Sequence, residues 1–186
     1  IAFAGRLVPE KGLDCLFRAC VKLLGKWTLT VVGSGPAQEQ LEQLAEKLGI
    51  ASRITWKGAL PPETVRTLWA EVDTLVIPSR TTPGWVETFH QPLVEAMGHG
   101  VTVVGSDSGA LPELIDTAGL VVPEDDVPAL TAALQHLADS PRERQRLGEV
   151  LDMDQGQAGR SNGRLRRQPA GDGAEIGQCL SVARPI

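Results

Sequence analysis

Short apolar runs rich in β-branched residues alternate with amphipathic segments along most of this chain, and that alternation constrains its fold more than any other feature. The run 75–77 and the run 101–104 are apolar almost throughout, which is typical of strands buried on both faces of a parallel sheet. The expected strands are residues 1–5, 28–32, 53–57, 74–78, 101–105 and 119–122. The pattern predicts an α/β fold, with a doubly wound, mostly parallel six-stranded sheet and helices on both faces.

The segments between these runs carry apolar residues at helical spacing. The first stripe predicts a helix that ends near Gly25, with one buried face made by Leu13, Leu16, Phe17, Cys20, Val21 and Leu24. A second helix is expected over about 41–48, and a third follows Pro61-Pro62, since proline is tolerated in a first helical turn. Further helices are expected over about 92–97, 127–138 and from 141, with a short one closing the run 105–113.

Composition narrows the class of protein. Hydrophobic residues make up 42% and charged residues 22% of 186 positions, which is ordinary usage for a globular domain. A net charge of −5 gives no reason to expect nucleic acid or an anionic membrane as the main partner. Three Cys cannot build a disulfide framework, which favours a reducing compartment.

The strand–helix pattern stops near residue 151. Residues 1–151 are therefore expected to form one Rossmann-like domain. Residues 152–186 hold six Gly, five Arg and four acidic residues without an apolar stripe, which predicts an irregular or disordered tail. The chain opens on an apolar run without Met or a basic leader, and we interpret it as the interior of a longer protein.

Ligands of doubly wound sheets bind outside the carboxyl ends of the strands, so the residues that follow each strand matter most. The first expected strand leads into Gly5-Arg6 and then Lys11-Gly12. Two cations on a loop that opens into a helix suit a diphosphate, and the helix start adds backbone donors. Solvated surface charges remain the alternative interpretation of this loop.

The second expected strand leads into Gly33-Ser34-Gly35-Pro36, which is similar to the start of a dinucleotide fingerprint. Gln38 stands where that fingerprint needs its third glycine, so an oxidoreductase is poorly supported. Glycine at position 35 still permits close backbone approach to a ligand.

A long loop, residues 78–90, follows the fourth expected strand and leads into a helix. Glu87 lies on this loop and Glu95 on the helix, so two carboxylates could accept hydrogen bonds from sugar and ribose hydroxyls. Glu63 and Glu71 show the same spacing on what is predicted to be an ordinary exposed helix face. We interpret His90 as a polar cap of the helix that follows.

Four motifs in this order resemble the C-terminal, donor-binding domain of the retaining family 4 glycosyltransferases, in which two Rossmann-like domains face a cleft (the GT-B fold). The motifs are Gly5-Arg6 with Lys11-Gly12, Gly33-Ser34-Gly35-Pro36, the segment from Glu87 to Glu95, and Ser108-Gly109-Ala110. The likeness spans about residues 1–150. On its own, the last motif is equally well interpreted as a strand–helix turn with capping Ser and Asp.

The resemblance implies a role for each of these positions. Arg6 and Lys11 would bind the donor diphosphate and stabilise it as the leaving group, and Glu87 would hold hydroxyls of the transferred sugar. Glu95 would bind the ribose. The remaining implied donor-binding positions are Gly5, Gly35, Phe89, His90, Gln91 and Gly109. Thr88 and His90 stand where the family commonly has glycine.

The resemblance also implies an incomplete enzyme of carbohydrate biosynthesis. The donor would be a nucleotide-diphosphate sugar, the acceptor a lipid or polysaccharide, and the acceptor-binding N-terminal domain would be missing. No metal or other cofactor is expected, because His90, His99 and His136 are scattered among unrelated surroundings. The expected location is cytoplasmic, with peripheral attachment to the inner membrane face left open for the full-length enzyme. A nucleotide-sugar epimerase and a non-catalytic nucleotide-binding module remain as alternatives.

Overall fold

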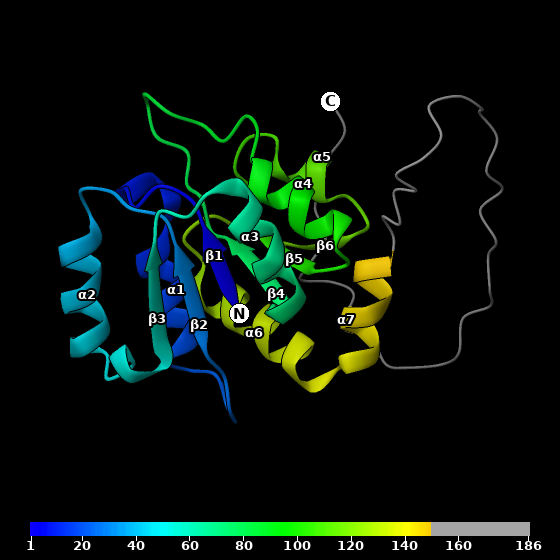
Figure 1. Ribbon diagram of the computed structural model, residues 1–186, viewed down its shortest axis with the longest axis horizontal. Coiled ribbons are helices and arrows are strands. Elements are labelled where there is room, and N and C mark those ends of the chain that lie inside the picture. Colours follow the sequence, from blue (N-terminus) through cyan, green and yellow to red (C-terminus); the bar gives the residue numbers. More distant parts are fainter. Residues whose placement is uncertain (150–186) are drawn as a thin grey trace, which may run out of the picture.

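The computed structural model describes residues 1–149, which form one six-stranded sheet with helices on both faces (Figure 1). The strands are β1 (Ala2–Ala4), β2 (Leu29–Val32), β3 (Ile54–Gly58), β4 (Thr74–Ile77), β5 (Thr102–Ser106) and β6 (Gly119–Val122). All neighbouring strands pair in parallel, in the order β3-β2-β1-β4-β5-β6. The predicted doubly wound α/β fold and its six strands are confirmed.

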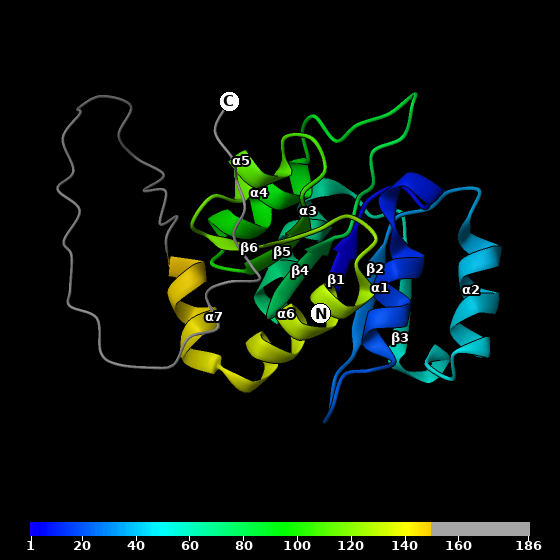
Figure 2. The ribbon, with the colours of Figure 1, turned by 180° about the vertical axis from the view of Figure 1, so that it is seen from behind.

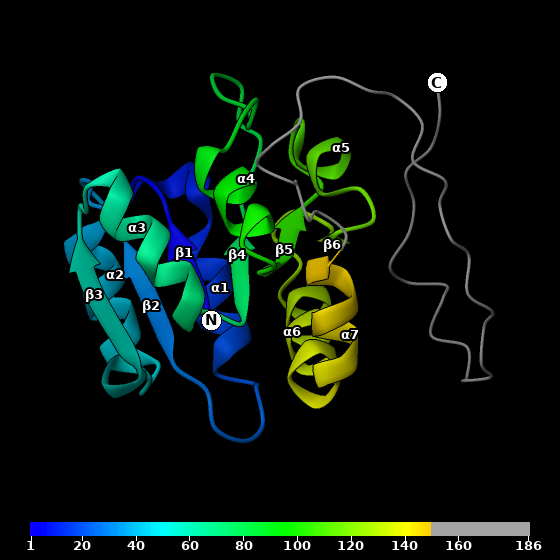
Figure 3. The same ribbon diagram turned by 45° about the vertical axis from the view of Figure 1, so that its right-hand side comes forward.

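The helices divide between the two faces of the sheet. Helices α1 (Leu13–Cys20), α2 (Gln38–Lys47) and α6 (Val127–Asp139) cover one face, and α3 (Pro62–Leu68), α4 (Gln91–Gly98) and α5 (Leu111–Ile115) cover the other (Figures 2 and 3). Helix α7 (Pro141–Gly148) follows α6, and single 3-10 turns lie at η1 (Pro9–Lys11), η2 (Ala51–Arg53) and η3 (Trp69–Glu71). From β1 the strand order runs outward through β2 and β3, and from β4 it runs outward the opposite way through β5 and β6. The order therefore reverses between β1 and β4, the position where such sheets bind ligands.

The pairing of β1 with β4 is short. Only Ala2 and Leu75 are in register across it, whereas the other neighbouring strands pair over three or four positions. We call this β1–β4 junction the central seam. Above it, at the carboxyl edge of the sheet, the loops that follow β1 and β4 meet.

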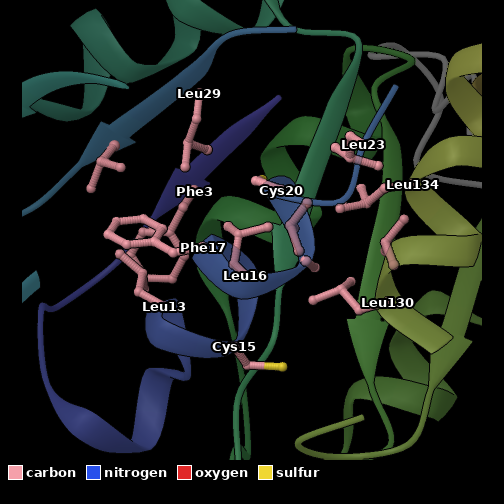
Figure 4. Close-up of a cluster of buried hydrophobic side chains, with 14 of the residues drawn as sticks. Phe3, Leu13, Cys15, Leu16, Phe17, Cys20, Leu23, Leu29, Leu130 and Leu134 are labelled. Carbon is pink, nitrogen blue, oxygen red and sulfur yellow. The ribbon is translucent and has the colours of Figure 1, made fainter. Parts of the chain in front are cut away.

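Two hydrophobic clusters hold the layers together. Figure 4 shows the cluster between the sheet and α1, α2 and α6, which includes Phe3, Leu13, Leu16, Phe17, Leu29, Leu130 and Leu134. The second cluster packs Trp69, Leu93 and Leu111 against the opposite face. Every residue of β4 is buried, as the apolar run predicts for a strand covered on both faces.

The first helix ends earlier than the apolar stripe predicts. Helix α1 stops at Cys20, and Val21 and Leu24 are 45% and 76% exposed rather than buried. The amides of Lys22 and Leu23 bond to carbonyls three residues back, so the chain tightens after Cys20 and leaves the helical register. Leu23 takes the core position instead. The tail predicted for residues 152–186 lies outside the described residues.

Candidate functional site

Lys11 and Glu87, 76 residues apart in the chain, form an ion pair at the central seam. Lys11 is 7% and Glu87 4% exposed. The hydroxyl of Ser79 donates to Glu87 Oε2 at 2.9 Å, and the hydroxyl of Ser106 in turn donates to the Ser79 carbonyl. Buried charges are tolerated when they are paired and hydrogen-bonded, so this cluster holds two opposite charges at the edge where ligands of such sheets bind.

The position of Lys11 depends on the glycine that follows it. Lys11 ends the 3-10 turn η1, and Gly12 reverses the chain with φ +67 before α1 begins. A Cβ at position 12 would lie 1.8 Å from the Pro78 carbonyl oxygen, on the far side of the seam. Only glycine allows the β1–α1 loop to approach the end of β4 this closely.

His90 begins helix α4 and is almost completely buried. Its Nδ1 accepts a hydrogen bond from the Leu93 amide at 3.2 Å, so it caps the helix as the sequence indicates. Burial and, second, the nearby charge of Lys11 lower the pKa of His90 to about 4. His90 is therefore neutral at physiological pH and accepts at Nδ1.

This lowered pKa predicts a loss of stability in acid. Because the unfolded chain binds a proton near pH 6.5 and the folded chain near pH 4, the contribution of His90 is complete above pH 6.5. It falls as the pH drops toward 4, by on the order of 3 kcal/mol. His90→Asn keeps a capping side chain that does not titrate, so its unfolding free energy should fall less over this range. Urea unfolding at pH 7, 5.5 and 4.5 checks this, and parallel losses in both proteins would contradict it.

The other predicted site residues differ in exposure and in the contacts that they make. Arg6 shares the loop with Lys11 and is exposed, whereas Lys11 is buried. Glu95 is half-buried on α4 and accepts from Gln91 Nε2 at 2.8 Å, and Phe89 is 61% exposed. A Cβ added at Gly35 would lie 2.3 Å from the Leu7 carbonyl oxygen, and one at Gly109 would lie 2.0 Å from the Glu87 carbonyl oxygen. A Cβ at Gly5 would lie 3.2 Å from the Phe3 ring.

The sequence interpretation assigned no role to four residues that contact the ion pair or the loop after β4: Ser79, Arg80, Trp85 and Glu124. Arg80 bonds to Asp14 and to Asp125, each at 2.7 Å, and thereby joins α1 to the loop after β6. The Lys11 ammonium lies 4.9 Å from the centroid of the Trp85 ring. Ser79 and Arg80 come just after Pro78, at the carboxyl end of the fully buried strand β4, and that position was a signal available in the sequence.

Residues 1–149 contain no group of three or more His, Cys, Asp or Glu side chains arranged to hold a metal ion. Over the same range, no helix has the length and apolarity needed to cross a membrane. Metal-free binding of a donor stays a prediction.

Comparison of the sequence with known proteins identifies a family and related proteins. The family described as "Glycosyl transferases group 1" matches residues 1–140. A GDP-mannose-dependent alpha-(1-6)-phosphatidylinositol monomannoside mannosyltransferase of Mycolicibacterium smegmatis is 35% identical over 150 residues, which are 77% of this chain and 39% of the relative. The chain thus spans about two fifths of the length of that relative.

Solved structures match the sheet and its helices. Sucrose-phosphate synthase from Thermosynechococcus elongatus superposes with a TM-score of 0.71 at 27% identity, over 80% of this chain and 38% of that protein. Anabaena HepE in complex with UDP superposes with a TM-score of 0.72 at 23% identity, over 79% of this chain and 41% of that protein. The resemblance inferred from the motifs is confirmed: the chain is a Rossmann-like half of a GT-B fold and belongs to the group 1 glycosyltransferase family.

Proposed function

We propose that this chain is the donor-binding domain of a retaining glycosyltransferase and binds a nucleotide-diphosphate sugar at the central seam. The observation that carries the proposal is the buried Lys11–Glu87 pair. It lies at the carboxyl ends of the two strands between which the sheet changes direction, and it offers a cation and a carboxylate side by side. A sugar diphosphate needs the same two partners, a cation for the phosphate and an acceptor for sugar hydroxyls.

The four predicted charged residues each have a role in binding the donor. Lys11 and the exposed Arg6 hold the diphosphate, and the first turn of α4 adds backbone donors. Glu87 accepts from hydroxyls of the sugar, and Glu95 accepts from the ribose. Pro92 lacks an amide hydrogen and the Leu93 amide bonds to His90, so the backbone donors at this helix start come from Gln91 and the residues just before it.

In the proposed transfer, the bond between the anomeric carbon and the diphosphate oxygen breaks and a bond to an acceptor hydroxyl oxygen forms on the same face. The proton of that hydroxyl passes to the departing diphosphate oxygen. Negative charge develops on the departing diphosphate as its bond lengthens. The ammonium of Lys11 and the guanidinium of Arg6 stabilise that charge, and a buried cation does so with little reorganisation. Glu87 keeps the sugar oriented by accepting hydrogen bonds from the hydroxyls of the sugar.

The chain alone is proposed to bind the donor without transferring its sugar. It corresponds to about two fifths of the mannosyltransferase from Mycolicibacterium smegmatis, and the acceptor contacts are assigned to a domain outside this chain. The names of a relative and of a structural neighbour suggest two donors to test. One relative uses GDP-mannose, and Anabaena HepE has been crystallised with UDP-glucose.

Calorimetric titration with UDP-glucose, GDP-mannose and ADP-glucose tests the proposal. At least one should bind, with an affinity that Glu95→Gln and Arg6→Ala each lower by roughly tenfold, the worth of one charge-assisted hydrogen bond. Glu71→Gln is the matched control, because Glu71 is an exposed glutamate with the same spacing to Glu63 as Glu95 has to Glu87. Absence of binding at millimolar donor would refute the site, and conversion of free donor without an acceptor would favour an epimerase.

A further inference from the structure

The cation proposed to hold the diphosphate is closely covered by neighbouring side chains. Lys11 is 7% exposed, its ammonium bonds to Glu87, and the Trp85 ring covers it with the centroid 4.9 Å away. A phosphate oxygen must come within about 2.8 Å of the ammonium nitrogen to form a charge-assisted hydrogen bond. Something next to Lys11 therefore has to move before a diphosphate binds there.

Trp85 belongs to a small hairpin in the loop between β4 and α4, a segment that projects from the carboxyl edge of the sheet (Figure 1). The Thr82 amide donates to the Trp85 carbonyl at 2.8 Å, and the Trp85 amide donates to the Thr82 carbonyl at 3.2 Å. Pro83 and Gly84 form its turn and are exposed. We call residues 82–86 the tip hairpin.

Both ends of the tip hairpin are anchored to the rest of the domain. Before it, the Arg80 amide donates to the Glu10 carbonyl at 2.8 Å, and Thr81 donates through its amide and its hydroxyl to the Glu124 carboxylate at 2.8 and 2.6 Å. After it, the Glu87 carbonyl accepts from the Ala110 amide at 2.9 Å. These bonds hold the residues on both sides of the tip hairpin, Arg80 and Thr81 before it and Glu87 after it.

We propose that Trp85 controls access to the donor site, because its indole occupies the side of the Lys11 ammonium that a diphosphate must reach. The inference rests on the proposed function of Lys11. When a nucleoside diphosphate binds, the indole leaves the ammonium and phosphate oxygens replace it, while the tip hairpin keeps its own hydrogen bonds. The contact between Trp85 and Lys11 competes with the ligand and lowers its affinity.

Removing the competitor should strengthen binding. A cation–aromatic contact is worth enough that Trp85→Ala should raise the affinity for UDP and GDP by roughly 2- to 30-fold, and Trp85→Phe by less. Trp85 is half-buried on a projecting loop and belongs to neither hydrophobic cluster, so the substitution leaves the core intact.

Titration of the 186-residue chain with UDP and with GDP, followed by calorimetry and by tryptophan fluorescence, tests the inference. The ligand should change the emission of the wild type and of Trp56→Phe, but not that of Trp85→Phe. Trp56 is the matched control because it lies on β3, edge-to-face with Phe17.

The outcomes separate this inference from the proposed function. If UDP or GDP binds the wild type and Trp85→Ala binds it no tighter, Trp85 does not control access, although the donor site stands. Weaker binding by Trp85→Ala would make Trp85 a direct ligand contact and would also overturn the inference. If neither protein binds UDP or GDP, both proposals fall.

Discussion

Lys11→Met should abolish nucleotide binding and lower the free energy of unfolding by about 3–5 kcal/mol, the usual cost of leaving one member of a buried ion pair alone. Glu87 is 4% exposed, and without Lys11 its remaining side-chain partner is the Ser79 hydroxyl. One neutral hydrogen bond does not compensate a buried carboxylate. Urea unfolding at pH 7 measures the stability, and calorimetry with UDP-glucose or GDP-mannose measures the binding.

A second substitution separates the two effects. Lys11→Met/Glu87→Gln removes both charges and should recover most of the lost stability, but it should not recover binding. Lys47→Met, at an exposed position on α2, serves as the control and should leave both properties nearly unchanged. A loss of less than about 1 kcal/mol for Lys11→Met would show that the pair is not buried in solution.

Gly12→Ala should prevent the domain from folding, or should lower its stability by more than about 3 kcal/mol, since backbone strain and a clash add together. The added carbon would lie 1.8 Å from the Pro78 carbonyl oxygen, which is backbone and cannot rotate away. The β1–α1 loop would have to lift off the end of β4 and would carry Lys11 with it. Circular dichroism and thermal unfolding measure the effect.

Gly49→Ala provides the matched control for this prediction. Gly49 has φ +70, close to the φ +67 of Gly12, but nothing lies within 4 Å of a Cβ at position 49. Its substitution should therefore cost only the left-handed backbone strain, about 1–2 kcal/mol. Equal losses in the two variants would mean that the close approach of Gly12 to Pro78 does not hold.

The strands were predictable because burial on both faces leaves a strong local mark. Each residue of β4 is apolar or small enough to be buried, and no helical stripe competes with that pattern. The end of α1 was not predictable, because Val21 and Leu24 continue the helical spacing after the backbone has left it. Periodicity records which residues are apolar, and the turn after Cys20 decides which of them face the core.

The site was predictable as a set of residues but not as a set of contacts. Sequence motifs indicated Lys11 and Glu87 separately, each as a partner of the ligand, and gave no sign that they pair with one another. That pairing depends on β1 lying next to β4, which is a property of the whole sheet. His90 was recognisable as a cap because its partner, the Leu93 amide, is only three residues away. Trp85 lies in a loop without periodicity, so nothing local indicated its contact with Lys11.

The short register at the central seam has a consequence for cooperativity. Ala2 and Leu75 are its only register partners, and above them the join is reinforced by side chains, Lys11 to Glu87 and Arg80 to Asp14. Side chains thus join the two halves of the sheet at the edge where the donor is proposed to bind. A ligand that contacts both halves at that edge would stabilise the folded domain as a whole. Its binding should therefore slow the hydrogen exchange of the β4 amides.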